Sequence, residues 1–369
     1  MTSRTLWSLV GSLAVAGVVA LSAMAAIRQG AASADPTLVS REELRSRIAA
    51  LPDRAHFGFA GVAFFKGRLY AATNLGLAVV HDFELERFYE WRSQDSVVSG
   101  PWLDAAHDSL WIQQAHDGSF LRYDGVRWHR VAMPPPPNGY YSRGNMLTGF
   151  AGVSSPSTFW MVGGGGVARA DADGRWTTEP QPPMPRFAAV TGIAPIGSDL
   201  LYIVNEEGAA LQYRPLRYVA YDRSRQWART ELGLIKFRDV VAAGESAYVR
   251  AEEGTLLSVA KGVVSTVTTP GFCEAITRTT AGELLAVFKD RGFFVYADGQ
   301  WMKKAEYPYD ASEGEHIAYL AAGDGNIAYA TARVPHIAAS ASAATQWTYS
   351  GTDALWVLDG QKFRRISFR

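Results

Sequence analysis

Residues Leu110–Trp128 read LWIQQAHDGSFLRYDGVRW, and this stretch decides the fold. It holds an apolar strand, a polar bend at Asp117-Gly118, a second strand, a tight turn at Asp124-Gly125 and a closing tryptophan. The same order returns over residues 284–301, which read LLAVFKDRGFFVYADGQW. A repeating unit of about 40–45 residues with four strands is typical of a β-propeller blade.

Seven such units can be laid end to end along the chain. Between the turns, apolar and polar residues alternate, which is the period of a β-strand. The second strand of each unit is expected to begin near Leu69, Leu110, Phe159, Leu201, Ala247, Leu284 and Asn326. We therefore predict an all-β fold, a seven-bladed β-propeller from about Phe57 to Arg369. Six blades is the alternative, because the first and last units are the least regular.

Short turns that contain glycine join the third and fourth strands and supply the positive φ angles that a two-residue hairpin requires. These turns are Asp124-Gly125, Asp173-Gly174, Lys261-Gly262, Asp298-Gly299 and Asp359-Gly360. An aromatic residue follows each turn or its equivalent. Because a large ring buries much apolar surface, we expect it to pack between adjacent blades rather than to bind a ligand. The residues concerned are Trp128, Trp176, Trp227, Trp301 and Phe363.

The composition agrees with a globular all-β chain. Hydrophobic residues make up 48% and aromatic residues 12%, with 35 glycines and 17 prolines to supply turns. Lys and Arg together number 36, as do Asp and Glu, so the formal net charge is zero. This balance argues against nucleic acid as a partner and leaves no single-sign field for long-range steering.

The N-terminal segment Leu6 to Ile27 contains no charged residue. About 20 apolar residues can span a bilayer as a helix, so we favour an uncleaved anchor over a cleaved signal peptide. The chain then divides into an anchor or signal segment (1–28), a linker with a short helix (29–56) and the propeller (57–369). The expected location is the bacterial periplasm, anchored to the inner membrane, or secreted if the segment is cleaved.

The linker carries a capping-box pattern, in which Ser40 begins a helix and Glu43 supports its first turn. We expect this helix to act as a spacer or to pack on the propeller, rather than to bind a partner. Cys273 is the single cysteine, which excludes an internal disulfide and a cysteine-based metal cluster within one chain. Its expected state is a buried, inert thiol.

The loops predict which face binds. Turns between strands one and two, and three and four, are short, whereas those between strands two and three and between blades are longer and more varied. Function tends to sit on long loops held by a rigid scaffold, so we assign binding to the long-loop face. The candidate binding residues are His116, Tyr140, Tyr141, Arg143, Glu206, Glu252, Lys289 and Arg291. Their mixed charge indicates a small polar ligand or an envelope protein as partner.

No catalytic motif stands out, and no cofactor is expected. The seven histidines show no HxH or HExxH spacing. The enzymatic alternative is a lactonase-like propeller hydrolase with calcium in its central channel. Its oxygen and nitrogen ligands would be gathered from several blades, for example Glu315 or His316 with His116, Glu206 or Glu252.

The unit from Leu110 to Trp128 resembles the repeat of the two-component-regulator propellers, in which a Leu-Trp strand leads through a glycine bend to an Arg-Tyr-Asp turn and an aromatic. Leu110-Trp111, Gly118, Arg122-Tyr123-Asp124 and Trp128 match that pattern. The resemblance implies an extracytoplasmic sensing propeller, here without a signalling output domain. We therefore expect a membrane-tethered module that binds a ligand or a protein, as a sensor or scaffold. A structural subunit of an envelope complex is a further alternative.

Overall fold

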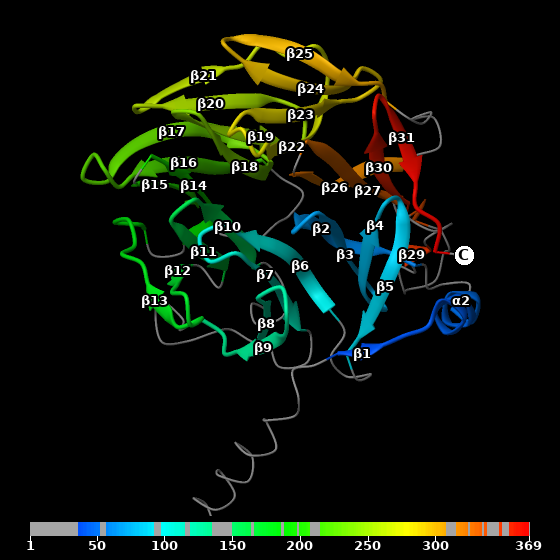
Figure 1. The fold of residues 1–369 in the computed structure, drawn as a ribbon. Helices are drawn as coiled ribbons and strands as arrows, with labels where there is room; N and C mark the ends of the chain where they lie inside the picture. The colour runs from blue at the N-terminus through cyan, green and yellow to red at the C-terminus, as the bar shows by residue number, and fades with distance from the viewer. Residues whose placement is uncertain are drawn as a thin grey trace, which may run out of the picture.

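The computed structural model describes residues 36–51, 57–91, 97–114, 119–134, 150–163, 166–185, 188–197, 199–206, 215–307, 315–323, 325–333, 336–337, 347–348 and 354–368. Seven antiparallel sheets stand in a ring (Figure 1). Each contains four main strands that are paired in the order in which they occur along the chain. The predicted seven-bladed propeller is therefore confirmed. The predicted N-terminal anchor lies outside the described residues. The described part of the chain holds no helix long and apolar enough to span a membrane.

The blades follow one another in chain order. Blades 1 and 2 consist of β2 (Phe59–Phe65), β3 (Arg68–Thr73), β4 (Gly76–His81), β5 (Glu84–Glu90), β6 (Val97–Asp104), β7 (Ser109–Gln114), β8 (Phe120–Tyr123) and β9 (Trp128–Val131). Blades 3 and 4 consist of β10 (Ala151–Ser155), β11 (Thr158–Gly163), β12 (Gly166–Ala170), β13 (Trp176–Thr178), β14 (Ala189–Ile196), β15 (Asp199–Asn205), β16 (Leu216–Asp222) and β17 (Ala228–Ile235).

Blades 5 to 7 complete the ring. They consist of β18 (Phe237–Ala243), β19 (Ser246–Ala251), β20 (Leu256–Ala260), β21 (Val263–Thr266), β22 (Cys273–Arg278), β23 (Leu284–Phe288), β24 (Gly292–Ala297), β25 (Gln300–Ala305), β26 (Glu315–Gly323), β27 (Asn326–Arg333), β30 (Leu355–Asp359) and β31 (Lys362–Arg365). The short strands β28 (His336–Ile337) and β29 (Trp347–Thr348) form a separate ribbon between β27 and β30. Every second strand begins within two residues of its predicted start.

Two of the five predicted hairpin turns have positive φ angles at both residues, whereas in the turns at Asp124-Gly125, Asp173-Gly174 and Asp359-Gly360 only the glycine of the pair does. Lys261 and Gly262 have φ angles of 51° and 80°, and Asp298 and Gly299 have angles of 52° and 78°. Two successive positive φ angles match the right-handed twist of the strands that they join. This is why each of these turns pairs a polar residue with a glycine.

The aromatic residues that follow the hairpins pack against the preceding blade, as predicted. Trp128 is buried, and its ring lies 5.3 Å from that of Trp91 at the end of blade 1. Trp176 and Trp301 each donate an indole N–H at 2.8 Å to a main-chain carbonyl that follows the outer strand of the preceding blade. Phe363 of blade 7 lies 4.5 Å from Phe293 of blade 6. These rings join neighbouring blades into one core.

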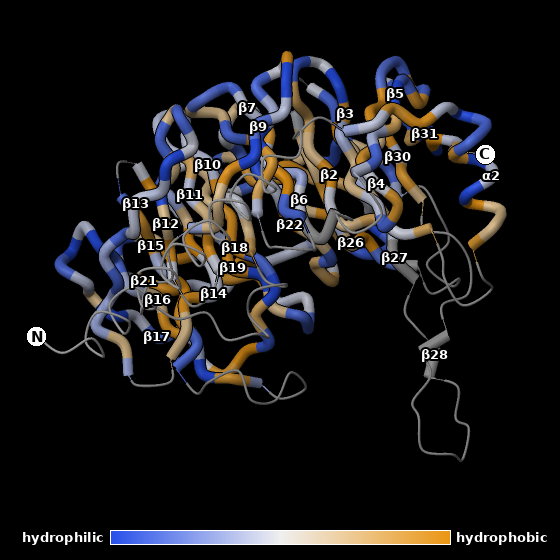
Figure 2. Tube along the Cα trace, turned by 90° about the horizontal axis from the view of Figure 1, so that it is seen from below, coloured by the Kyte–Doolittle hydropathy of each residue, from blue (hydrophilic) through white to orange (hydrophobic). Residues whose placement is uncertain are grey.

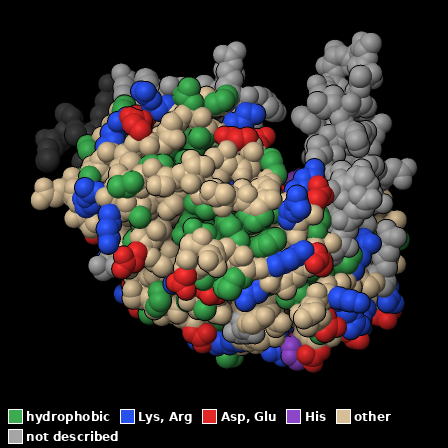
Figure 3. Space-filling model, turned by 90° about the horizontal axis from the view of Figure 1, so that it is seen from above, with side chains coloured by type: hydrophobic (Ala, Val, Ile, Leu, Met, Phe, Trp, Pro, Cys, Tyr) green, Lys and Arg blue, Asp and Glu red, His purple; other side chains and the backbone are tan. Residues whose placement is uncertain are grey.

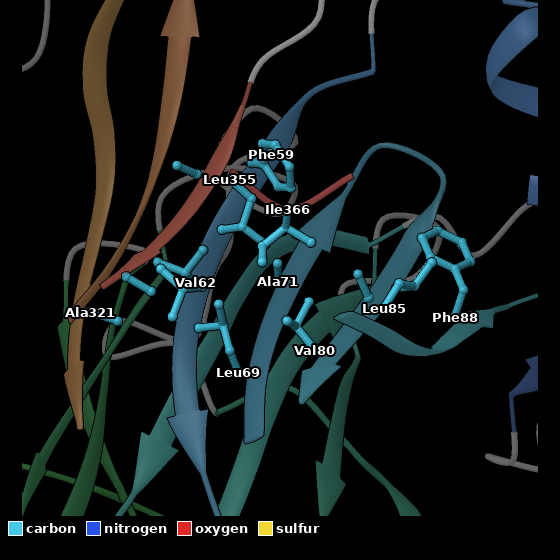
Figure 4. Close-up of a cluster of buried hydrophobic side chains, with 14 of the residues drawn as sticks. Phe59, Val62, Leu69, Ala71, Val80, Leu85, Phe88, Ala321, Leu355 and Ile366 are labelled. Carbon is cyan, nitrogen blue, oxygen red and sulfur yellow. The ribbon is translucent and has the colours of Figure 1, made fainter. Parts of the chain in front are cut away.

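The ring closes where blade 1 meets blade 7, and both blades are continuous in sequence, with no strand exchanged between them. Side chains from both blades form one buried cluster, in which Leu355 and Ile366 lie over β2 and β3 (Figure 4). Phe57, just before β2, packs its ring 5.0 Å from that of Phe368, just after β31. Side-chain packing therefore holds this seam.

The predicted linker helix is present as α2 (Arg41–Ala49), and the Ser40 hydroxyl accepts the N–H of Glu43 at 3.1 Å, as the capping box predicts. Leu44 of α2 is fully buried in the seam cluster. The short strand β1 (Thr37–Leu38), just before the helix, extends the sheet of blade 1 by pairing with β5. The helix thus packs on the propeller, as expected.

Hydrophobic residues gather in the strands, and polar residues gather in the turns around them (Figure 2). The side that carries the outer strands β21 and β25 shows a group of hydrophobic side chains with basic and acidic ones around it (Figure 3). Val263 on β21 and Met302 on β25 are exposed there. The exposed Lys303 and Lys304 on β25 discourage strand pairing with another molecule along this edge.

Candidate functional site

Four of the predicted binding residues lie within the described part of the chain, in long-face turns of blades 4 to 6. Glu206 follows β15, and its carboxylate accepts hydrogen bonds from Arg229 at 2.7 and 3.1 Å and from the Tyr221 hydroxyl at 3.0 Å. The hydrogen bond from Arg229 is the largest cause that holds the pKa of Glu206 below its ordinary value. This side chain links strands within blade 4.

The other three are more exposed. Glu252, in the turn after β19, forms an ion pair of 2.9 Å with Arg238. Lys289 and Arg291 are exposed in the turn between β23 and β24, and their main-chain N–H groups donate to Phe272 and Phe288. His116, Tyr140, Tyr141 and Arg143 lie outside the described residues, so their assignment to the binding face stays a prediction.

The central channel contains two cavities that meet end to end. One, of 350 Å³, lies among the first residues of the innermost strands, which is the long-loop end. The other, of 390 Å³, lies at the short-hairpin end and is rich in serine and threonine. Both are lined by Val62, Pro101, Trp102 and Leu320, which therefore surround the section where they join. Glu206, Glu252, Lys289 and Arg291 line neither cavity.

Bulges shape the long-loop end of the channel. The pairing between the first two strands shifts register in blades 1, 2, 4, 5, 6 and 7, close to the start of each innermost strand. A bulge re-aims the side chains beside it. In blade 5 the bulged Arg238 lies outside the cavity lining, whereas the next residue, Asp239, lines the cavity. Blade 6 repeats this arrangement with Glu274 and Ala275.

A glycine permits the inner strands to approach closely at this level. A Cβ atom on Gly61 would lie 1.9 Å from the carbonyl oxygen of Gly100 in blade 2. Any side chain at position 61 would therefore push β2 and β6 apart. Since both glycines line the cavity at the long-loop end, this contact also sets the shape of the candidate site.

Asp239 and Arg250 are the charged side chains that line the long-loop cavity among the described residues. They face each other across β18 and β19, and the Arg250 Nε and Nη2 atoms lie 2.6 and 2.5 Å from the same oxygen, Oδ2 of Asp239. Arg250 is 13% exposed and Asp239 is 40% exposed. The second oxygen, Oδ1, accepts no hydrogen bond from any described residue. The pair therefore presents one open carboxylate oxygen.

A second polar group lies beside this pair, between blades 6 and 7. The Glu274 carboxylate accepts the Tyr307 hydroxyl proton and, at 2.9 Å, the main-chain N–H of Ile317. His316 lies nearby, and burial is the largest cause that lowers its pKa, with Arg238 and Arg250 acting in the same direction. Its Nδ1 atom is buried and meets no hydrogen-bond partner in the described part of the chain. The imidazole is therefore neutral near pH 7.

The sequence pattern did not predict that residues of blade 5 line the cavity. Asp239 and Arg250 fall within strands, where an alternating pattern predicts only which face a residue occupies. The available signal was the position of Asp239 near the start of an innermost strand, since such residues are the nearest to the propeller axis. The four predicted binding residues within the described ranges lie instead in the turns between strands two and three, and these strands are farther from the axis.

Cys273 is fully buried at the start of β22, as predicted, and burial raises the pKa of its thiol to about 12. Within the described ranges, no group of three or more His, Cys, Asp or Glu side chains could hold a metal ion. The calcium site of the hydrolase alternative also draws on His116, which lies outside those ranges. It stays a prediction.

No protein-family model and no curated protein matches the chain. Solved structures do. The β-propeller domain of the Trilobed protease from Pyrococcus furiosus aligns with a TM-score of 0.54 at 10% identity, over 85% of this chain and 98% of that one. Virginiamycin B lyase from Staphylococcus aureus aligns with a TM-score of 0.50 at 11% identity, over 75% and 92%.

PorZ, a bacterial surface component of the type-IX secretion system of Porphyromonas gingivalis, aligns with a TM-score of 0.52 at 14% identity. The match covers 84% of this chain but 45% of PorZ, so the chain spans less than half of that protein. At such identities these likenesses show the propeller fold alone. Membership in the two-component-regulator propellers therefore stays a prediction.

Proposed function

We propose that this chain is a membrane-tethered, extracytoplasmic β-propeller that binds a small polar ligand, or a polar loop of an envelope protein, at the long-loop end of its channel. The observation that carries the proposal is the Asp239–Arg250 pair, which lines a 350 Å³ cavity and leaves one carboxylate oxygen open. A concave site with a few convergent polar side chains is typical of ligand-binding pockets.

The chemistry of the pair defines what would bind. Asp239 Oδ1 accepts a hydrogen bond, so it suits a hydroxyl, amide or ammonium donor. Arg250 holds the carboxylate in place from the neighbouring strand, through two N–H groups on one oxygen. The aromatic rings of Phe150, Trp102 and Tyr319 line the same cavity and supply apolar contact for the rest of the ligand.

The proposed location outside the cytoplasm and at the membrane rests on the sequence. The uncharged segment Leu6 to Ile27 supports an anchor. The neighbour PorZ is described as a bacterial surface component of a secretion system, and two other neighbours are a lyase and a domain of a protease. One fold hosts binding and catalysis alike, so the site rather than the fold supports the assignment.

A double substitution that leaves the net charge of the protein unchanged tests the proposal. Full-length protein in detergent is used to capture partners from solubilised membranes and is screened against small polar compounds by thermal shift. Asp239→Asn combined with Arg250→Gln removes both charges, keeps the shape of the side chain at position 239 and leaves a polar amide at position 250, and it should abolish capture or the ligand-induced shift. The matched control is Arg68→Gln with Glu86→Gln, which neutralises a 2.6 Å pair that lines neither cavity. Equal binding by both double variants would refute the assignment.

A further inference from the structure

A third pocket lies at the seam where the ring closes, at the outer edge of the molecule. It has a volume of 230 Å³. Its charged lining consists of Arg41 and Arg45 from α2, Arg364 and Arg365 from β31, and Glu84 from β5. The formal charge of this lining is therefore four positive charges less one negative charge, or +3. Its remaining walls include the rings of Phe83 and Phe368.

The arginines of β31 are poorly neutralised by the protein. The Arg364 guanidinium lies 5.5 Å from the centre of the Phe83 ring, a cation–π contact that leaves its N–H donors available. Arg365 forms no ion pair with any described residue. Arg41 donates to the main-chain carbonyl of Leu85 and lies 3.5 Å from Glu84, where both side chains are more than half exposed. Such an exposed pair contributes little.

We propose that this pocket binds a phosphate group. Guanidinium groups present planar sets of N–H donors that fit the oxygens of phosphate, and several of them converge here from two segments. A neutral ligand would leave Arg364 and Arg365, which form no ion pair with any described residue, without a counter-charge. A carboxylate would compensate only one charge, whereas a phosphate dianion supplies two charges and more acceptor oxygens.

A phosphate group bound in this pocket would link the two ends of the described chain. Arg41 and Arg45 belong to the helix before blade 1, and Arg364 and Arg365 belong to the last strand of blade 7. Among the described strands none is exchanged between these blades, so in that part of the chain side-chain contacts hold the seam. A phosphate held from both sides removes like-charge repulsion across the seam and stabilises ring closure.

The phosphate could come from a lipid headgroup or from a soluble phosphomonoester. Residue 28 at the end of the proposed anchor is nine residues from Thr37, a distance of at most about 30 Å for an extended chain. A headgroup is therefore within reach of α2 if the anchor is retained. The phosphate site itself rests on neither the anchor nor the channel ligand, because the pocket and the channel cavities share no residue.

Thermal unfolding of the full-length protein in detergent tests the site, with inorganic phosphate as probe and ionic strength held constant by sodium chloride. We expect a saturable rise in Tm of several degrees, which Arg364→Gln with Arg365→Gln should remove. The control, Arg127→Gln with Arg175→Gln, makes the same change in net charge at exposed hairpin positions and should keep the response. Calorimetric titration of phosphate should show binding to the control and none to the pocket variant.

The proposal is overturned if phosphate stabilises no more than chloride does, or if both double variants respond equally. Full-length protein in nanodiscs identifies the source. If a lipid phosphomonoester supplies the group, discs that contain phosphatidic acid raise Tm above that in phosphatidylcholine discs, and added phosphate has no further effect. If a soluble phosphate is the ligand, added phosphate raises Tm equally in both discs. Neither result depends on capture at the long-loop face.

Discussion

The Glu274 carboxylate in blade 6 accepts the main-chain N–H of Ile317 in blade 7 at 2.9 Å, and both groups are buried. Glu274→Ala would leave a buried donor without an acceptor, which costs ~1–3 kcal/mol. Glu274→Gln keeps an acceptor oxygen and should cost less. Chemical denaturation of both variants measures the difference. Equal losses would show that the contact between blades contributes nothing specific.

Trp128 is 6% exposed and packs against Tyr89 and Trp91 of the preceding blade. Trp128→Ala should lower the free energy of unfolding by ~3–5 kcal/mol, because it opens a cavity between two blades. Trp301→Ala should cost less, since Trp301 is only half-buried. The control is Val126→Ala on the same hairpin as Trp128, where the side chain is 87% exposed. A Trp128 variant as stable as this control would contradict the packing role.

The thiol of Cys273 should be unreactive in the folded protein. Burial raises its pKa to about 12, so almost no thiolate exists at neutral pH, and the thiolate is the reactive form. Because Cys273 is the single cysteine of the chain, labelling with a maleimide reports on it alone. We expect labelling only above the denaturant concentration that unfolds the protein. Rapid labelling without denaturant would show that blade 6 opens readily.

The blades could be predicted from the sequence because their signals are local. The turn at Asp298-Gly299 and the cap at Ser40 each depend on residues a few positions apart, and both are found as predicted. Packing of Trp128 on the preceding blade followed from the size of its ring and from its recurrence. These parts of the fold need no knowledge of distant contacts.

The channel site could not be predicted because it depends on the register between strands and on the assembly of the blades into a ring. The bulge that places Asp239 in the cavity leaves no periodic mark in the sequence, and Arg250 becomes its partner only through the register of β18 and β19. Glu206 seemed free as a turn residue, but Arg229 binds it from two strands away. A sequence pattern predicts on which face of a strand a side chain lies. The distance of that side chain from the propeller axis depends on how the blades assemble into the ring.

His316 should make stability depend on pH. Burial lowers its pKa in the folded protein below 6.5, whereas the unfolded chain has the ordinary value. The unfolded state therefore binds more protons as pH falls through 6.5, and stability decreases until the folded pKa is passed. His316→Gln should reduce the loss between pH 7 and pH 5, measured as the difference from wild type. His81→Gln, which makes the same substitution at an exposed histidine, is the matched control.

The long-loop face is expected to capture the partner. Tyr141 and Arg143 occur in the proline-rich stretch of sequence between β9 and β10, and tyrosine and arginine often dominate interfaces. Tyr141→Ala with Arg143→Ala should abolish capture of the partner by full-length protein and leave Tm nearly unchanged, because substitutions at binding surfaces outside the core usually change stability little. The control is Asp298→Ala with Lys261→Ala, on hairpins of the opposite face, which should capture normally. Loss of capture in this control alone would assign binding to the short-hairpin face and would remove the channel mouth at Asp239 as its centre.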